Sequence, residues 1–331
     1  METHETDPNV KIHQVCEGVY QIYLPLPMRP SIVNVYLIND GDEWALIDTG
    51  MHTTDSVQTF KSALKEVGCP PSDIRKLIST HHHADHFGTS QTYHELTGAR
   101  VFLNELELSR VTRLKSTERH PEAFAFFTQH GLPLESPNDL PTPGNFYGTR
   151  YNPAEPEHFL RDGESLFVGK REIQVVWTPG HTQGHCCLYL PDGGVMIVGD
   201  HLLPKITPHV GVYFQGPQNP LRDFLQSQEK IQNFEVRKVL PAHGGVFSDH
   251  RGRAKQIIQH HKSRLDEMRD LVTGKAKSAY EVASTVFKMN SDLPIFHVFA
   301  ATFETLAHLH LLLYEGKVRR IEDETVTRFV A

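Results

Sequence analysis

The heptapeptide Thr80-His81-His82-His83-Ala84-Asp85-His86 carries a cluster of metal-binding residue types in the pattern His-x-His-x-Asp-His. In an extended chain, side chains two residues apart point the same way, so His81 and His83 can face one metal ion while the residue between them faces away. A helix is expected over residues 87–97, and the turn into it redirects the carboxylate and the last imidazole of the cluster toward a neighbouring point. This spacing suits two metal ions rather than one.

Three further metal-binding residues each follow an apolar run at which a strand is expected to end. They are His181 in Thr178-Pro179-Gly180-His181, Asp200 in Gly199-Asp200, and His243 in Pro241-Ala242-His243-Gly244. Strand ends flanked by glycine or proline are places where a rigid scaffold presents side chains into a shared cleft. We therefore expect these three residues to converge on the heptapeptide at one site.

The residue types limit the identity of the metal. Imidazole and carboxylate ligands suit zinc, iron or manganese, and the absence of cysteine at these positions argues against a soft-ligand site. A lone His-x-His pair is often a surface or core feature, but seven residues in this order and spacing indicate a metal centre. The flanking histidines His82, His185 and His201 are interpreted either as packed core residues or as groups that hold the ligands in place.

The ordered set resembles the signature of the metallo-β-lactamase fold, and the turn Asp48-Thr49-Gly50 after an expected strand also matches that family. The resemblance implies an α/β protein built as a four-layer αββα sandwich, with two sheets face to face and helices outside. The ligands that it implies are His81, His83 and His181 for one ion, Asp85, His86 and His243 for the other, and Asp200 as the bridge. The expected cofactors are two divalent metal ions per chain, Zn²⁺ first, with Mn²⁺ or Fe as alternatives.

Composition and length exclude several classes of protein. The 331 residues exceed the usual size of one domain, so a large domain and a smaller one are expected. A net charge of −7 provides no overall basic field, which argues against tight nonspecific binding of nucleic acid but leaves local basic patches open. The four cysteines form no spaced framework, so reduced thiols are expected.

Targeting segments are not evident. Residues 1–11 are polar and lack the apolar core of a secretory signal. No run approaches the roughly 18 uninterrupted apolar residues that cross a bilayer. We therefore expect a cytoplasmic protein that does not act at a membrane.

Residues 104–155 lose strand alternation and are predicted to form an inserted helical cap. They carry Phe124, Phe126 and Phe127, followed by several prolines. Two interpretations stay open: these aromatic side chains line an apolar pocket near the metals, or they pack the insertion onto the sandwich.

The last part of the chain has a helical pattern. An amphipathic run ends at Gly274, Ser278-x-x-Glu281 forms a capping box, and residues 298–314 give a third helix before an alternating tail over 318–330. This arrangement resembles the winged-helix extension of the branch that contains β-lactamase-like endoribonucleases and glyoxalase II-like acyl hydrolases. The predicted division is a catalytic domain over residues 1–255 and a winged-helix-like domain over 256–331.

The charge of this extension argues against a role in DNA binding. Its hairpin turn, Glu322-Asp323-Glu324, is acidic, and its helices carry mixed charge. We therefore expect it to pack against the sandwich or against a second subunit, which leaves a homodimer open.

The reaction class follows from the site and from motifs that are missing. A dinuclear site supplies hydroxide at neutral pH and polarises a carbonyl or phosphoryl oxygen. The chain has no Gly-x-Ser-x-Gly elbow and no phosphate-cradling Gly-x-x-x-x-Gly-Lys-Ser/Thr loop, so hydrolysis by metal-bound water is predicted. Asp85 is the candidate catalytic residue, as a ligand that also orients the nucleophilic water or accepts its proton.

Asp200 limits the substrate classes that the family resemblance implies. True β-lactamases of this fold generally lack an aspartate bridge there, whereas glyoxalase II-type thioesterases, lactonases and phosphodiesterases have one. Acylhomoserine lactonases carry a tyrosine where Leu203 stands. We expect a small-molecule thioester, ester or lactone with an apolar portion. The alternative is a phosphodiesterase or nuclease, and the further alternatives are a β-lactamase, a mononuclear iron dioxygenase and a metal-stabilised interaction protein without catalysis.

Overall fold

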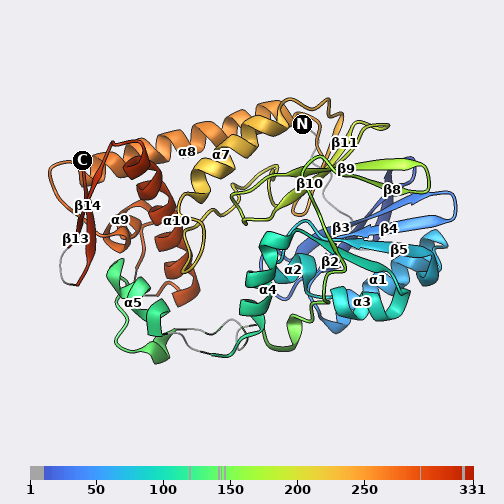
Figure 1. Ribbon diagram of the computed structural model, residues 1–331, viewed down its shortest axis with the longest axis horizontal. Helices are drawn as coiled ribbons and strands as arrows, with labels where there is room; N and C mark the ends of the chain where they lie inside the picture. Colours follow the sequence, from blue (N-terminus) through green and yellow to red (C-terminus); the bar gives the residue numbers. More distant parts are fainter. Residues whose placement is uncertain are drawn as a thin grey trace.

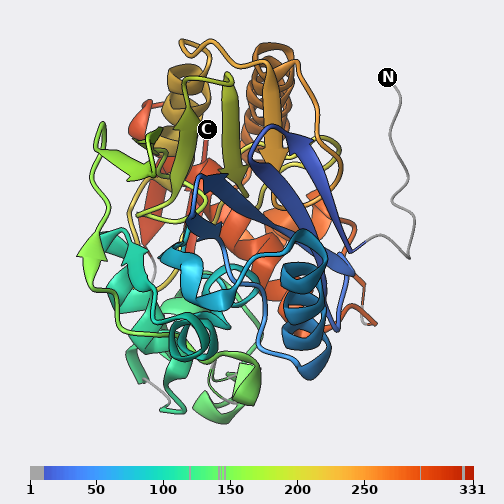
Figure 2. The ribbon, with the colours of Figure 1, turned by 90° about the vertical axis from the view of Figure 1, so that its right-hand side faces the viewer.

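Two β-sheets lie face to face, with helices on the outer face of each. The computed structural model describes residues 11–118, 121–140, 142, 144, 147–290, 292–322 and 325–331. Figure 2 shows the order of the layers, and Figure 1 shows a group of helices that extends beyond one end of the sandwich. The αββα sandwich expected from the sequence is confirmed. Residues 1–10, expected to lack a secretory signal, and the centre of the acidic turn at 323–324 lie outside the described residues.

The first sheet has the strand order β1-β2-β3-β4-β5-β6-β7. Its strands are β1 (Ile12–Cys16), β2 (Val19–Pro25), β3 (Ile32–Asp40), β4 (Glu43–Ile47), β5 (Ile74–Ile78), β6 (Arg100–Leu103) and β7 (His158–Phe159). Strands β1 to β4 pair antiparallel, and β4 to β7 run parallel. The parallel part places the carboxyl ends of β4 and β5 side by side, where the heptapeptide begins.

The second sheet has the order β12-β11-β10-β9-β8. Its strands are β8 (Ser165–Val168), β9 (Arg171–Trp177), β10 (Cys186–Leu190), β11 (Val195–Gly199) and β12 (Lys238–Pro241). Strand β10 is antiparallel to both β9 and β11, and β11 is parallel to β12. Strands β9, β11 and β12 therefore point the same way, and their carboxyl ends share one edge.

Adjacent residues of the second sheet enter two different hydrophobic cores. Val175 lies between the sheets with Ile47 of β4, whereas Val176 faces outward into a cluster with Phe224 of α7 (Pro220–Ile231). This alternation follows from the two-residue period of a strand. Because both faces of the sheet are covered there, its central strands β10 and β11 are apolar runs without polar alternation.

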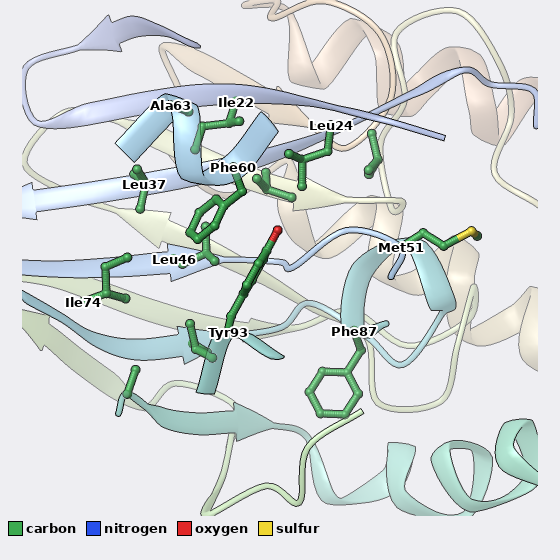
Figure 3. Close-up of a cluster of buried hydrophobic side chains, with 14 of the residues drawn as sticks. Ile22, Leu24, Leu37, Leu46, Met51, Phe60, Ala63, Ile74, Phe87 and Tyr93 are labelled. Atoms are coloured by element: carbon green, nitrogen blue, oxygen red, sulfur yellow. The ribbon is translucent and has the colours of Figure 1, made fainter. Parts of the chain in front are cut away.

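Helices α1 (Thr54–Val67) and α3 (Ser90–Thr97) cover the outer face of the first sheet. Figure 3 shows Phe60 of α1 against Tyr93 of α3, and their rings stack with centroids 4.1 Å apart. Both ends of α1 carry residue types that are typical of helix caps. The Thr53 hydroxyl accepts the Ser56 N–H, and Gly68 closes the helix at φ 70°.

The outer face of the second sheet is covered by α7 and by the long helix α8 (His250–Val272). Helix α7 was not predicted, because its apolar residues lie between the segments that carry recognisable motifs. Helices α9 (Ala279–Val286) and α10 (Ile295–Tyr314) and the hairpin β13 (Arg319–Glu322) and β14 (Thr327–Val330) follow as expected. The predicted domain division at residue 255 falls inside α8 and stays a prediction.

Helix α10 is a core helix. Among the described residues it is the one helix long and apolar enough to cross a membrane, yet 67 % of its apolar window is buried inside the protein. It packs against α8 and α9, and Leu306 and Leu309 join the core on the outer face of the second sheet.

The insertion contains helices, and Phe127 packs in a place that neither interpretation predicted. Its helices are α4 (Leu108–Lys115) and α5 (Pro121–Gln129). Short 3₁₀ turns in the insertion cover Glu105–Glu107, Pro137–Asp139 and Gly148–Arg150. A further 3₁₀ turn, Pro71–Asp73, lies outside the insertion and precedes β5. Helix α5 lies beside α9 and α10 (Figure 1), and the ring of Phe127 contacts those of Phe299 and Phe303 at centroid distances of 5.2 Å each. Phe127 therefore fastens the insertion to α10, whereas Phe126 packs against Phe214 and the core on the outer face of the second sheet. The apolar face of α10 offered a partner that neither interpretation considered.

Candidate metal centre

The loops that follow strands of both sheets meet at one edge of the sandwich. The loops after β4 and β5 supply Asp48 and the heptapeptide, and those after β9, β11 and β12 supply His181, Asp200 and His243. Hydrogen bonds join the two sheets here, since the Cys186 N–H donates to the Thr80 carbonyl at 2.9 Å. Each candidate ligand therefore lies in a segment that is anchored at the end of a sheet strand.

The structure brings all seven predicted residues together in two groups. His81, His83, His181 and Asp200 form one group, and Asp85, His86 and His243 form the other. Within each group, one ligand atom from every residue lies within 4.8 Å of all the others. The three histidines of the first group and the three residues of the second are the sets that the family resemblance implies, and Asp200, implied as the bridge, lies with the first group.

The distances inside the groups suit a bound cation. His81 Nε2 and His181 Nε2 lie 2.9 and 3.1 Å from His83 Nδ1. His243 Nε2 lies 3.3 Å from an Asp85 oxygen and 3.5 Å from an Asp200 oxygen. Ligand atoms about 2.0–2.2 Å from a tetrahedral ion are roughly 3.3–3.6 Å apart, so the His243 distances match this spacing and the two His83 distances are slightly shorter.

Two buried atoms at the centre lack a hydrogen-bond partner, although each faces an oppositely charged group at 3.5 Å. His86 Nε2 and Asp200 Oδ1 are both buried and accept or donate no hydrogen bond within the described part of the chain. Buried polar atoms without a partner are costly, and a cation between them would remove that cost. The residues present therefore fit divalent metal ions.

Outer contacts fix the tautomers of the histidines. The Nδ1–H groups of His181 and His243 donate to the carbonyls of His209 and Ile32, at 2.8 and 3.0 Å. Their Nε2 atoms are thereby left as lone-pair donors that face the centre.

Asp48 is a functional residue whose role the sequence did not reveal. Its carboxylate accepts the Thr80 N–H at 2.7 Å and the His86 Nδ1–H at 2.9 Å. It therefore ties the start of the heptapeptide to its last imidazole. The match of the Asp48-Thr49-Gly50 turn to the family pattern was the available signal, but it indicated no contact.

The helix after the ligand strand starts earlier than predicted. Asp85 and His86 lie inside the short helix α2 (Ala84–Phe87), and α3 begins only at Ser90. Gly88 separates the two, and a side chain at that position would meet the Ala84 carbonyl oxygen at 2.0 Å. The two ligands are therefore redirected by a helical turn and not by a loop that precedes a helix.

The two groups differ in protonation when no metal is bound. Burial, reinforced by neighbouring imidazoles, holds the pKa values of His81 and His83 well below the ordinary range. Burial also opposes protonation of His86, but Asp85, Asp200 and Asp48 together raise its pKa well above the ordinary value. The imidazoles of the first group are thus neutral and ready to bind a cation, whereas His86 of the second group holds a proton. Burial also opposes protonation of His243 in that group, but Asp200 and Asp85 raise its pKa.

Metal binding to the metal-free protein is therefore expected to occur in two steps that differ in proton release. Filling the first group releases no proton from His81 or His83, because they are already neutral. Filling the second group must displace the proton of His86, so its affinity rises with pH until the raised pKa is passed. Isothermal titration calorimetry in two buffers of different ionisation enthalpy measures this release, and heats that do not depend on the buffer would contradict the assignment.

A buried carboxylate in the insertion joins two ligand loops. Glu107 is fully buried and accepts the backbone N–H and the Nδ1–H of His82, and its other oxygen accepts the N–H of Gly184. His82 belongs to the heptapeptide and Gly184 to the His181 loop. Sequence reasoning missed Glu107, because no local pattern distinguishes it from the neighbouring exposed glutamate.

Replacement of Glu107 by glutamine is expected to destabilise the metal-free protein by about 1–3 kcal/mol, because an amide N–H₂ would face buried donors. Metal affinity should fall about 10- to 100-fold, as for other residues that orient metal ligands. Urea unfolding with chelator and metal titration measure the two effects. Glu105→Gln is the matched control, since Glu105 is exposed in the same 3₁₀ turn; equal behaviour of the two variants would refute this role.

The three histidines that flank the ligands have different contacts. His82 binds Glu107, and His185 Nδ1 lies 2.8 Å from the Thr178 hydroxyl, so both support ligand loops. His201 is buried and its ring contacts Phe224 at 5.2 Å. Tyr213 packs on Phe303, with ring centroids 5.0 Å apart.

A pocket of about 260 Å³ opens directly onto both groups. His83, Asp85, His181, Asp200 and His243 form its floor. Tyr147 also lines it, as the one described residue of the 104–155 insertion that does so. The pocket makes the candidate ligands accessible to a small molecule.

Sequence comparisons match almost the whole chain. The profile of the Metallo-beta-lactamase superfamily matches residues 28–243, and that of the Metallo-beta-lactamase-like, C-terminal domain matches residues 265–331. The chain is 26 % identical over 316 residues to the probable metallo-hydrolase YqjP of Bacillus subtilis, with 91 % of this chain and 94 % of that protein covered.

Two relatives have names that state a reaction. The chain is 28 % identical over 169 residues to the hydroxyacylglutathione hydrolase of Maricaulis maris, covering 50 % of this chain and 46 % of that protein. It is 24 % identical over 240 residues to the atrochrysone carboxyl ACP thioesterase of Aspergillus fumigatus, covering 72 % and 59 %.

Solved structures agree over the full length. A metallo-beta-lactamase family protein from Thermus thermophilus is 34 % identical, with a TM-score of 0.82 and coverage of 96 % of this chain and 99 % of that one. A beta-lactamase domain protein from Burkholderia ambifaria is 28 % identical, with a TM-score of 0.85 and coverage of 99 % and 95 %. The chain therefore belongs to the metallo-beta-lactamase superfamily, and within it to the metal-dependent hydrolases.

Proposed function

We propose that the protein is a dinuclear hydrolase that cleaves a thioester, ester or lactone with an apolar acyl portion. The observation that carries the proposal is the apolar wall of the pocket above the two ligand groups. Zn²⁺ is the proposed metal, because the ligand atoms are imidazole nitrogens and carboxylate oxygens at distances that suit tetrahedral coordination.

The pocket wall is built from apolar side chains of several elements. They are Leu26, Met28, Pro30, Met51, Leu203, Ile206, Pro208 and Phe296. Met28, Ile206 and Phe296 are 37, 54 and 52 % exposed, which is high for large apolar side chains. An acyl chain that covers them would remove apolar surface from water and would place its carbonyl group near the pocket floor.

The same two groups would hold the ions, with Asp200 between them. Two cations of this kind acidify a water molecule and polarise a carbonyl oxygen. Asp85 lines the pocket, and although burial raises its pKa, the charges and hydrogen bond of His86 and His243 lower it overall. Asp85 is therefore ionised at neutral pH and can accept a proton from water.

Tyr147 can hold the substrate by a hydrogen bond. Burial, followed by the charge of Asp85, raises its pKa to about 12, so its hydroxyl stays protonated at neutral pH. A protonated phenol in the pocket can donate to a carbonyl or carboxylate oxygen of the substrate.

The two relatives named for their reaction support this choice. One is named as a hydrolase of hydroxyacylglutathione and the other as a thioesterase of an acyl carrier protein. Both names describe cleavage of an acyl thioester. The proposed substrate class therefore agrees with the apolar pocket and with the relatives.

A substrate panel tests the proposal. The metal-loaded protein is assayed with hexanoyl thioesters, p-nitrophenyl hexanoate, a six-carbon lactone and bis-p-nitrophenyl phosphate. We expect turnover of the acyl substrates in preference to the phosphodiester. Activity confined to the phosphodiester would overturn the proposal and favour the nuclease-like alternative.

A further inference from the structure

A second pocket, also of about 260 Å³, lies beside helix α4 and is lined by polar and charged residues. Its lining residues are Ser109, Arg110, Thr112, Arg113, Ser116, Glu118 and Gln215. The lining therefore offers two guanidinium groups, three hydroxyl groups and an amide, and it contains no large apolar side chain. Such a set of donors suits an anion with several oxygen atoms.

The two arginines have no carboxylate partner. Neither Arg110 nor Arg113 forms an ion pair with any residue in the described part of the chain. Glu118, the one carboxylate in the lining, is exposed and pairs with neither of them. Both arginines are half-buried, and burial lowers their pKa values. Arginine nevertheless stays charged in proteins. The nearby carboxylate of Glu107 acts to raise the pKa of Arg110, but it is hydrogen-bonded to His82 and Gly184, so neither guanidinium group has an ion-pair partner of its own.

Aromatic rings hold both guanidinium groups in place. Arg110 lies over the Tyr213 ring at 5.8 Å and donates to the Phe214 carbonyl at 3.3 Å. Arg113 lies over the Phe214 ring at 4.9 Å and donates to Gln215 Oε1 at 3.3 Å. Each guanidinium has five N–H donors, so most remain available to a ligand. Because the rings already order the side chains, an anion would bind without ordering them first.

Residues of α4 and Tyr213 contact both the second pocket and residues that support or line the metal centre. Glu107, immediately before α4, holds two ligand loops, and Arg110 and Arg113 lie about 4.5 and 9 Å farther along the helix axis. The Tyr213 ring beneath Arg110 lies 6.0 Å from the ring of His209, which lines the metal pocket. One aromatic residue therefore separates the arginine pair from the wall of the metal pocket.

We propose that the arginine pocket binds a phosphate group carried by the thiol half of the substrate. This inference rests on the proposed thioesterase function and narrows it to acyl thioesters of phosphate-bearing carriers. The acyl chain would occupy the apolar pocket, and the carrier would run past Tyr213 to α4. The same donors could bind free phosphate, so the experiment must separate the two sources.

Two thioesters with the same acyl group test the proposal. Hexanoyl-coenzyme A carries phosphate groups, and hexanoyl-N-acetylcysteamine carries none. For the metal-loaded protein we expect a lower KM for the coenzyme A thioester. In R110Q/R113Q, kcat/KM for that substrate should fall about 10- to 100-fold, and that for the neutral thioester should stay within about twofold.

Three controls accompany the double variant. K115Q removes a positive charge from an exposed position of the same helix outside the pocket lining, and should keep the preference. R110K/R113K retains the charge and should recover part of it. Thermal unfolding and metal content show whether any variant is misfolded.

The outcomes distinguish the sources of the anion. Equal kcat/KM for both thioesters, unchanged in R110Q/R113Q, would overturn the proposal. Competitive inhibition by inorganic phosphate, seen with the coenzyme A thioester and lost in R110Q/R113Q, would support it, whereas phosphate binding without any carrier preference would assign the pocket to free phosphate instead.

A failure of the proposed function gives a different result. If neither thioester is hydrolysed, the thioesterase proposal fails together with its phosphate-bearing substrate. Calorimetric titration with inorganic phosphate then tests the anion site alone. Phosphate binding to the wild-type protein that is absent in R110Q/R113Q would still support an anion site at the two arginines. No binding to either protein would refute that site.

Discussion

Replacement of Asp200 by alanine is expected to lower kcat/KM by about a thousandfold or more and to reduce the metal content of the protein. Asp200 Oδ2 lies 3.5 Å from His86 Nε2 and 3.6 Å from His181 Nε2, so one carboxylate faces both ligand groups. Its pKa is well below the ordinary value because His86 and His243 outweigh the effect of burial. A metal ion contributes several kcal/mol of transition-state stabilisation, which corresponds to about a thousandfold in rate.

Steady-state kinetics and elemental analysis of Asp200→Ala measure the two effects together. Asp266→Ala is the matched control, because Asp266 is an exposed carboxylate on α8 that pairs with Arg269. The control should keep its activity and its metal. A variant without Asp200 that still bound two ions and turned over normally would show that this residue does not join the groups.

Replacement of Asp85 by asparagine is expected to lower kcat about 10²- to 10⁴-fold while most of the metal is retained. The amide keeps one oxygen as a ligand but cannot accept a proton from water. Asp85 is 22 % exposed, compared with 13 % for Asp200, and it is the carboxylate that faces the pocket more openly. Loss of a proton acceptor should therefore affect kcat more than KM.

The metal content of Asp85→Asn decides between the two roles of this residue. With two ions still bound, a large loss of kcat supports proton transfer. A kcat near that of the wild type with full metal content would leave Asp85 as a ligand only. Asp73→Asn, on the 3₁₀ turn before β5, serves as the matched control.

The seven metal-binding residues could be predicted because each signal is local. His81 and His83 sit two residues apart at a strand end, and Asp200 directly follows the apolar run of β11. Parallel strand direction then determines that such ends meet at one edge. The capping box at Ser278 and Glu281 was predictable for the same reason, and both of its hydrogen bonds are present, at 2.7 and 3.2 Å.

Residues whose role depends on distant contacts could not be predicted. Glu107 lies 77 positions before its partner Gly184, and nothing in the local sequence joins them. Phe127 was assigned to the insertion correctly, but its partners Phe299 and Phe303 belong to the last helix. In both cases the contact forms only in the folded chain, and the sequence offers several acidic or apolar residues that could have made it. A single sequence does not specify which of them does.

The C-terminal helices contribute to the site more directly than their sequence suggested. Phe296 of α10 lines the metal pocket, and Glu304 of the same helix accepts the Nδ1–H of His209 at 3.2 Å. The carbonyl of His209 in turn accepts the Nδ1–H of His181. The extension therefore packs against the sandwich, as expected, and it also supports a candidate ligand.

The metal stoichiometry of the purified full chain tests the central claim most directly. The protein is stripped with chelator, reloaded with Zn²⁺, and freed of unbound metal, and the ratio is measured by inductively coupled plasma mass spectrometry for the wild type and for His243→Ala. Two ions per wild-type chain and about one per His243→Ala chain are the predicted result. Saturation of the wild type at one ion, with the same value in the variant, would contradict the dinuclear centre.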